Sequence, residues 1–204
     1  MQSLMSTLYS DIAKKIKEAV QIAISTPNHP EAKLRELVSP LFADYIKTKQ
    51  LDLNFEQRDE LVLANGTPDT VYNRLILEYK KPGVIKPDNA KNRVVIEKVR
   101  GYIEDLAEKE GWKKDRLLGV AFDGNYFIFI RKARRWVEQE PIAVSLESIE
   151  YFFQNLIKLV GGYPLLPDYL RILKFQSITR RKKHTKRYPN FPSNVMRKSQ
   201  LALM

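Results

Sequence analysis

Residues 66–83 read GTPDTVYNRLILEYKKPG, and the pattern within this stretch decides the fold class. Residues 71–80 have an apolar middle that is typical of a buried strand, and turn-forming residues precede and follow it. Because side chains alternate along a strand, Glu78 and Lys80 project to the same face where the strand leaves the core. Asp69 lies in the turn that enters the strand. The spacing therefore predicts two carboxylates and an ammonium group at one edge of a sheet.

These three side chains have the chemistry that phosphodiester hydrolysis requires. The carboxylates of Asp69 and Glu78 can hold Mg²⁺, which prefers hard oxygen ligands. A bound metal ion polarises the phosphate and lowers the pKa of a coordinated water. The Lys80 ammonium can orient the attacking water and offset the charge that develops on the phosphate. The alternative is a turn aspartate beside a surface ion pair, because so short a pattern also arises by chance.

The segments on both sides of this predicted strand contain helices. Apolar residues recur at the helical period over residues 8–24 and again over residues 31–48. Pro40 predicts a kink or a broken turn in the second of these helices. A third helix is predicted from about residue 89 to residue 110, with Val94 among its inward-facing side chains.

The remaining segments predict a sheet of mixed direction. Two apolar runs flank Asp123-Gly124-Asn125, which is the clearest hairpin signal in the chain. A last helix is predicted from Ser145 to about Val160. Weaker strand signals occur at residues 51–55, 60–63, 135–138 and 142–144. Helices and strands in this order make an α/β (α+β) layer fold with a mixed central sheet.

The composition argues against several other kinds of site. The 204 residues include no cysteine and two histidines, His29 and His184, which are far apart. Thiolate zinc sites, disulfide scaffolds and Ser-His-Asp triads are therefore disfavoured. No apolar run of about 18 residues predicts a membrane span, and the N-terminus lacks a signal-peptide pattern. We therefore expect a cytoplasmic protein with no membrane partner.

The net charge of +11 is unevenly distributed. Residues 171–204 hold 10 Lys or Arg and no acid, so residues 166–204 are expected to form a basic, flexible tail or truncated linker. Residues 1–165 then form the folded domain. Within it, residues 71–135 contain 16 basic and 9 acidic residues, which is compatible with a surface that faces phosphate groups. A solvated lysine-rich face explains the same charge equally well.

Residues 66–83 resemble the PD-(D/E)xK nuclease superfamily, and in particular the N-terminal nuclease domains of type I and type IIG restriction-modification enzymes. Residues 30–41 resemble the first helix of those domains, and residues 119–130 resemble the hairpin that follows their site. The similarity spans about residues 25–160. It implies a restriction-endonuclease-like fold and a Mg²⁺-dependent DNA endonuclease of a restriction system, for which Mn²⁺ is an expected substitute metal.

The same resemblance implies a role for each site residue. Asp69, Glu78 and Lys80 are the expected catalytic residues. Asp69 and Glu78 are also expected metal ligands, together with a glutamate from the first helix. Glu31 is the better candidate for that glutamate and Glu36 is the second, because residues five apart on a helix point in different directions.

The sequence departs from the family pattern in two ways. Many relatives carry a glutamine on the helix after the lysine, whereas residues 91–106 contain none and have Lys98 and Arg100 in that region. Methyltransferase motifs are also absent, so we expect either a stand-alone nuclease or a fragment cut before the methyltransferase; in the second case a methyltransferase or specificity domain or subunit is the expected partner. The basic side chains that could contact DNA phosphates are Lys81, Lys98, Arg100, Arg131, Lys132, Arg134 and Arg135.

Two other functions compete with cleavage of DNA. A non-catalytic nucleic-acid-binding or assembly module could keep the same fold, and its basic surface would then matter more than its carboxylates. A basic protein that binds RNA through residues 180–187 is a third possibility. Metal binding that disappears with Asp69→Ala separates the first two functions, and truncation at about Tyr169 tests the third.

Overall fold

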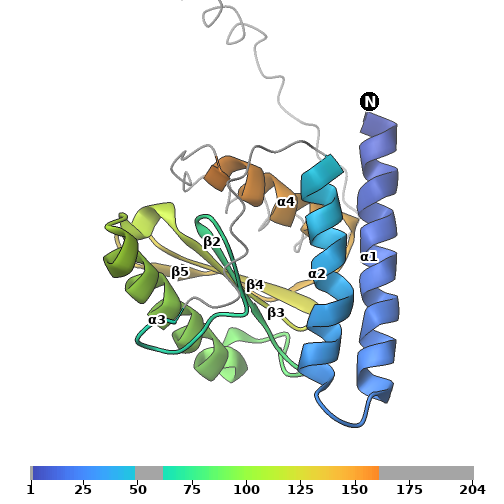
Figure 1. Ribbon diagram of the computed structural model, residues 1–204, viewed down its shortest axis with the longest axis horizontal. Coiled ribbons are helices and arrows are strands. Elements are labelled where there is room, and N and C mark those ends of the chain that lie inside the picture. The colour runs from blue at the N-terminus through green and yellow to red at the C-terminus, as the bar shows by residue number, and fades with distance from the viewer. Residues whose placement is uncertain (1, 49–61, 161–204) are drawn as a thin grey trace, which may run out of the picture. The chain divides into compact units, whose positions relative to one another are not determined.

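The computed structural model describes residues 2–48 and 62–160, and the statements below concern these two ranges (Figure 1). The chain divides into two units, residues 1–167 and residues 168–204, and every described residue belongs to the first. The predicted basic tail and the strand signal at residues 51–55 lie outside the described residues.

Four α-helices and one six-stranded mixed sheet make up the described ranges. The helices are α1 (Gln2–Ser25), α2 (Pro30–Thr48), α3 (Arg93–Glu110) and α4 (Leu146–Val160), with short 3₁₀ helices η1 (Asn89–Asn92) and η2 (Lys114–Arg116). The strands are β1 (Thr70–Tyr72), β2 (Leu75–Tyr79), β3 (Leu118–Phe122), β4 (Tyr126–Lys132), β5 (Trp136–Glu138) and β6 (Ile142–Ala143). None of these described helices combines the length and apolar character needed to cross a bilayer.

The sheet has the strand order β1-β2-β3-β4-β5, and β6 also pairs with β4. β2 and β3 run parallel, and the other pairs are antiparallel. A parallel pair requires a crossover connection, which α3 supplies between β2 and β3. The predicted mixed α/β fold is therefore confirmed.

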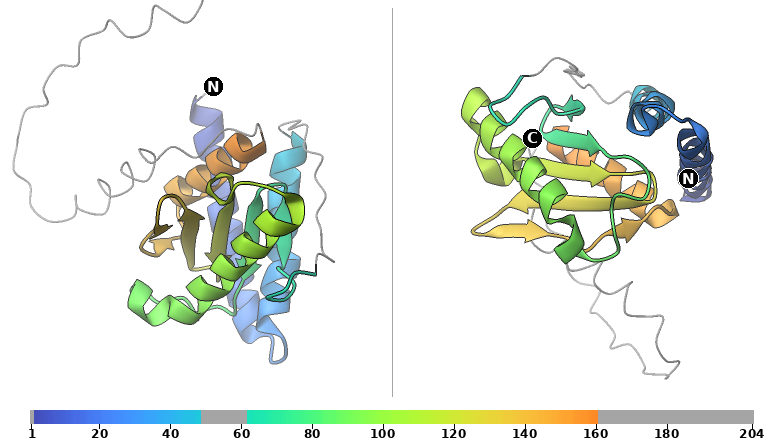
Figure 2. Two further views of the ribbon diagram at one scale, coloured as in Figure 1. Left: turned by 90° about the vertical axis from the view of Figure 1, so that its left-hand side faces the viewer. Right: turned by 90° about the horizontal axis from the view of Figure 1, so that it is seen from below.

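Helices cover both faces of the sheet (Figure 2). Leu75, Leu77 and Tyr79 of β2 enter a core that also contains buried side chains of α1, α2 and α4. Ile76 enters a second core, which lies between the sheet and α3. Since side chains alternate along β2, Glu78 lies on the same face as Ile76. Tyr79 therefore faces the opposite side of β2 from Glu78.

The single strand predicted over residues 71–80 is in fact a hairpin. β1 and β2 pair antiparallel, with Thr70 opposite Leu77, and the chain turns at Asn73, whose φ is 52°. Asparagine tolerates this left-handed conformation better than most residues, so the turn forms without glycine. Continuing the register by one residue places Asp69 opposite Glu78.

The broken turn that Pro40 could introduce does not occur, since α2 continues through the proline, with Val38 and Phe42 on either side of it buried in the core. One detail of the predicted third helix is wrong. Val94 is 85% exposed, although the periodicity placed it inward. The buried face of α3 is instead formed by Val95, Ile96, Val99, Tyr102, Ile103, Leu106 and Ala107.

The predicted hairpin around Asp123-Gly124 is confirmed and joins β3 to β4. Gly124 has a φ of 83°, and a Cβ at this position would lie 2.3 Å from Cγ2 of Val20. Both the backbone conformation and the close approach of α1 therefore require glycine here.

The buried carboxylate of Asp123 connects this hairpin to the segment that follows β2. Its Oδ1 accepts hydrogen bonds from the backbone N–H groups of Asn125 and Tyr126, each at 2.9 Å. Its Oδ2 accepts from the N–H groups of Gly83 and Ile85, each at 3.0 Å. Burial raises the pKa of Asp123, although these four donors act in the opposite direction. Asp123 thereby fixes the backbone directly after the predicted catalytic lysine.

Candidate active site

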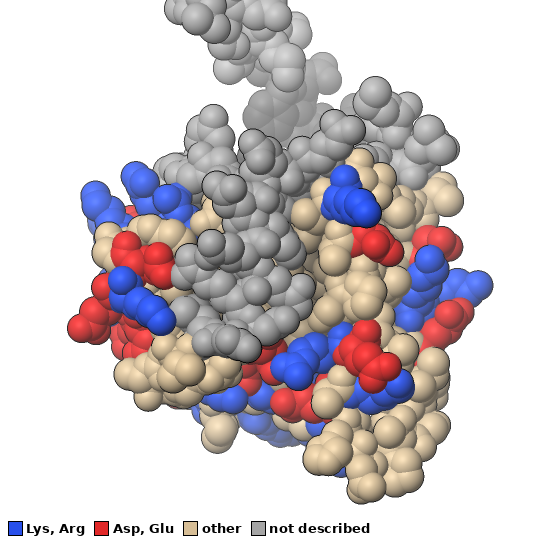
Figure 3. Space-filling view, viewed as in Figure 1, with Lys and Arg blue, Asp and Glu red and all other residues tan. Residues whose placement is uncertain are grey.

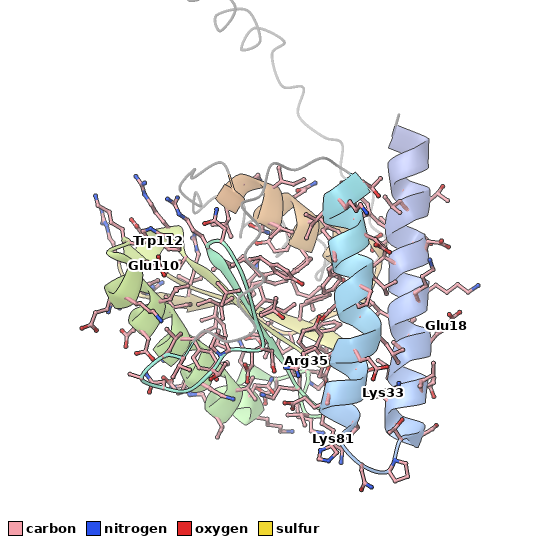
Figure 4. The ribbon with its side chains drawn as sticks, viewed as in Figure 1. Glu18, Lys33, Arg35, Lys81, Glu110 and Trp112 are labelled. Atoms are coloured by element: carbon pink, nitrogen blue, oxygen red, sulfur yellow. The ribbon has the colours of Figure 1, made fainter. Side chains whose placement is uncertain are left out.

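Charged side chains from three parts of the fold meet at the carboxyl end of β2. Glu78 lies in β2, Lys80 follows it, and Asp69 precedes β1. Glu31 and Arg35 come from α2, where a separation of four residues places them on one helix face. In Figure 4, Arg35 points from α2 toward the sheet, and Lys81 lies beside the first turn of α2.

Glu78 is the most deeply buried member of this group, with a side chain only 2% exposed. Its Oε1 accepts hydrogen bonds from Nζ of Lys80 at 2.6 Å and from Nζ of Lys98 at 2.7 Å. Its Oε2 is also buried, and no donor in the described part of the chain reaches it. A buried carboxylate oxygen without a partner costs free energy unless a cation or water occupies the adjacent position.

Asp69 is held beside Glu78 by two hydrogen bonds. Its Oδ2 accepts from the backbone N–H of Tyr79 at 2.7 Å, and its Oδ1 accepts from Nη1 of Arg35 at 2.8 Å. Burial and the negative charge of Glu78 raise the pKa of Asp69 to about 6, although Tyr79 N–H, Arg35 and Lys80 act in the opposite direction. The two carboxylates therefore interact electrostatically, as a shared metal site requires.

The raised pKa of Asp69 predicts how the stability of the metal-free protein depends on pH. The folded carboxyl keeps its proton up to about pH 6, compared with an ordinary pKa of 3.8, so the folded state binds more protons between these values. The free energy of unfolding therefore falls as the pH rises through this window, by at most about 3 kcal/mol. Asp69→Asn removes this contribution.

Thermal unfolding in EDTA, followed by circular dichroism at about pH 4 and about pH 7, measures the effect. Asp69→Asn should gain stability relative to the wild type at the higher pH. A difference between the two proteins that is the same at both pH values would show that this carboxyl keeps its ordinary pKa.

Lys80 lies between two carboxylates. Besides its bond to Glu78, its Nζ donates to the backbone oxygen of Tyr79 at 2.8 Å and lies 3.7 Å from Oε1 of Glu31. The other oxygen of Glu31 accepts a hydrogen bond from the backbone N–H of Lys81 at 3.1 Å. Glu31 is therefore tied to both residues that follow β2.

Glu36, the second candidate for the helix glutamate, lies outside this cluster. Its carboxylate pairs with Lys33 one turn earlier on α2, at 2.7 Å, and its side chain is largely exposed. Of the two helix glutamates, the structure brings Glu31 and not Glu36 to Lys80.

Lys98 and Arg100, both predicted to contact DNA, form ion pairs within the protein. Lys98 pairs with Glu78, and this hydrogen bond and charge raise the pKa of Lys98 although partial burial lowers it. Arg100 pairs with Glu97 and Glu138, and its guanidinium lies 5.2 Å from the ring centre of Trp136. Lys98 thus belongs to the site, and Arg100 belongs to a neighbouring ion-pair cluster.

Arg131 is 5% exposed, and burial lowers the pKa of its guanidinium. Alternation along β4 places it with Phe127 and Phe129, on the face of the sheet opposite to Glu78. This position gives no support to a phosphate contact by Arg131. Lys81 is exposed and lies next to the site. Arg134 and Arg135 are also exposed, but they follow β4 and are not part of the cluster at β2. Lys132 lies over the ring of Trp136.

On the described part of the face in Figure 3, Lys and Arg are interspersed with Asp and Glu and do not form a separate basic patch. The cluster at β2 follows the same pattern. Three carboxylates face three cationic groups: Glu31, Asp69 and Glu78, and Arg35, Lys80 and Lys98.

Sequence reasoning missed the residues that support the site. Arg35 could have been found from its position four residues after Glu31. Tyr102 donates from its hydroxyl to the backbone oxygen of Thr67 at 3.1 Å. Asp105 accepts from the backbone N–H of Asn65 at 2.7 Å. These two residues of α3 anchor the segment that leads to Asp69.

The donor set at this site suits a hard divalent cation. No group of three His, Asp or Glu side chains in residues 2–48 and 62–160 is arranged to hold a metal ion as it stands. Asp69 and Glu78 nevertheless provide adjacent carboxylates, and Oε2 of Glu78 lacks a partner among the described residues. Mg²⁺ commonly binds to one or two carboxylates and completes its coordination with water and substrate oxygens. The residues present therefore fit Mg²⁺ or Mn²⁺.

Comparisons of the chain with protein-family models, curated proteins and solved structures give no match. The functional argument therefore depends on the geometry and chemistry of the site itself.

Proposed function

We propose that this chain is a Mg²⁺-dependent endonuclease that hydrolyses phosphodiester bonds in DNA and has a restriction-endonuclease-like fold. The observation that carries the proposal is the buried Oε2 of Glu78, which no donor in residues 2–48 and 62–160 reaches, with Asp69 and Lys80 beside it. A cation bound at this oxygen would satisfy it, and the second carboxylate of Asp69 beside it favours a cation there. The mixed sheet with helices on both faces is compatible with this fold.

Asp69 and Glu78 would hold the metal ion, and Mn²⁺ could replace Mg²⁺. When bound, the metal ion lowers the pKa of a coordinated water and polarises the scissile phosphate. Arg35 and the N–H of Tyr79 keep Asp69 oriented toward β2. Lys80 presents an ammonium group that can orient the attacking water and offset the negative charge that develops on the phosphate.

The charge balance of the cluster also supports an anionic substrate. Its three carboxylates are matched by three cationic groups, so a dication bound alone would leave an excess of positive charge. A DNA phosphate that binds beside the metal ion reduces this excess. Membership of a restriction system, with DNA recognition supplied by a methyltransferase or specificity partner, extends the proposal on the basis of the resemblance over residues 25–160.

Glu31→Gln should slow cleavage of supercoiled plasmid DNA, whereas Glu36→Gln should not. The two substitutions are identical and lie on the same helix, but only Glu31 contacts Lys80 and the backbone of Lys81. Groups that support metal ligands typically contribute 10- to 100-fold, so we expect roughly a 10-fold loss for Glu31→Gln. Gel electrophoresis of plasmid incubated with Mg²⁺ or Mn²⁺ measures the rate, with EDTA as the metal-free control.

Cleavage that EDTA abolishes, and that only the Glu31 substitution weakens, supports the proposal. Equal losses from both substitutions would place the effect outside the site. A wild-type chain that binds DNA but neither binds metal nor cuts would favour the non-catalytic binding module.

A further inference from the structure

Lys98 is fixed in place by contacts that a solvated surface lysine lacks. It lies on α3, 20 residues after Glu78, and its Nζ donates to Oε1 of that glutamate at 2.7 Å. The same ammonium group lies 5.5 Å from the ring centre of Tyr102, one helical turn further along α3. The aromatic ring and the carboxylate together hold the ammonium against the site.

The two oxygens of Glu78 have different surroundings as a result. Oε1 accepts hydrogen bonds from both Lys80 and Lys98, whereas Oε2 is buried and no described donor reaches it. The terminal torsion of a glutamate is broad and roughly two-fold, so by itself it does not determine which way the carboxylate faces. Two ammonium groups on one oxygen do determine it.

Lys98 reaches Glu78 from α3, whereas Lys80 lies on the same chain segment as Glu78. Lys80 belongs to the same strand segment as Glu78 and divides its contacts between Glu78, Tyr79 and Glu31. α3 in contrast holds the segment before Asp69, because Tyr102 bonds to Thr67. A contact from α3 to Glu78 therefore sets one carboxylate relative to the other.

We propose that Lys98 is a positioning residue of the metal site, which holds Oε1 of Glu78 so that Oε2 is the oxygen presented to a divalent cation. The inference rests on the proposed function.

The inference leads to opposite effects on metal affinity and on cleavage. The ammonium of Lys98 repels a dication held by the same carboxylate, so Lys98→Gln should bind Mn²⁺ about tenfold more tightly. The substitution also removes a charged group that fixes Oε1, so kcat for plasmid cleavage should fall by roughly tenfold, with a smaller change in KM. A residue with only a structural role would not move these two quantities in opposite directions.

The experiment compares the full chain with Lys98→Gln, Lys98→Arg and Lys91→Gln. Titration with Mn²⁺ alone, followed by electron paramagnetic resonance, gives the metal affinity, and plasmid cleavage gives kcat and KM. Lys98→Arg keeps the charge and should behave like the wild type within severalfold. Lys91→Gln removes the same charge from η1, outside the cluster, and should leave both quantities unchanged.

The inference is supported if Lys98→Gln binds Mn²⁺ more tightly and cleaves more slowly than the wild type, and if Lys98→Arg stays close to the wild type in both quantities. Wild-type Mn²⁺ affinity in Lys98→Gln overturns the role of Lys98 but leaves the proposed function intact. Weaker Mn²⁺ binding with a lower unfolding temperature also overturns it, since this is the result of a structural role. Absence of Mn²⁺ binding in every variant and in the wild type overturns the proposed function and the inference together.

Discussion

Lys80→Ala is expected to lower kcat for plasmid cleavage by about 10²- to 10³-fold, as the loss of one preorganised charge-stabilising group does in other enzymes. The Nζ of Lys80 contacts Glu78 and lies near Glu31, so in the proposed mechanism its positive charge is available to the reacting phosphate. Glu78 keeps its second cation, Lys98, in this variant, so the fold should persist, and Mn²⁺ should bind at least as tightly as to the wild type because one repelling ammonium group is gone. Single-turnover cleavage at saturating protein measures the chemical step directly.

Two other lysine substitutions serve as references for this result. Lys81→Ala removes the next charge in the chain, from an exposed side chain, and should raise KM or salt sensitivity more than it lowers kcat. Lys113→Ala changes an exposed lysine that precedes η2 and should have no effect. If Lys80→Ala retained the wild-type kcat, the ammonium at this position would have no part in the chemistry.

Asp123→Ala should lower the free energy of unfolding by about 3 to 5 kcal/mol, which is among the largest effects that a single substitution produces. The carboxylate of Asp123 is fully buried and accepts four backbone hydrogen bonds. Its removal leaves four N–H groups without an acceptor, at the β3–β4 turn and in the segment that includes Gly83. Urea unfolding followed by circular dichroism gives the change.

Asp115→Ala is the matched control, because Asp115 is exposed in η2. Its substitution should change the free energy of unfolding by less than about 0.5 kcal/mol. The loss of unfolding free energy for Asp123→Asn should lie between those for Asp123→Ala and Asp115→Ala, because the amide keeps one acceptor oxygen but turns a donor toward two N–H groups. A loss below about 1 kcal/mol for Asp123→Ala would mean that water replaces the carboxylate.

Local pattern and turn chemistry were sufficient to predict much of the fold and part of the site. Alternation along residues 75–80 placed Glu78 and Lys80 on one face, and the structure joins them by a hydrogen bond. The Asp-Gly pair at residues 123–124 located a hairpin correctly, because such a turn depends on only a few neighbouring residues. The β1–β2 turn was missed because Asn73 adopts a positive φ without an adjacent glycine.

Contacts between distant segments could not be read from the sequence. Helical spacing places Arg35 on the same face as Glu31, but the contacts of Arg35 with Asp69 and of Lys98 with Glu78 are not visible in a local pattern, because each depends on how a helix packs against the sheet. Arg131 is a different case. Alternation along β4 already placed it with Phe127 and Phe129, so its burial was predictable from the period-two rule that located Glu78.

The central claim is that Asp69 and Glu78 form a site for a divalent cation, and Mn²⁺ binding to the full chain tests it most directly. Electron paramagnetic resonance titrations of the wild type, Glu78→Gln and Asp69→Asn, with Asp44→Asn as an exposed control on α2, give the affinities. We predict that the wild type and Asp44→Asn bind Mn²⁺ and that both site variants lose this binding. Equal Mn²⁺ binding by all four proteins, or by none, would contradict the account.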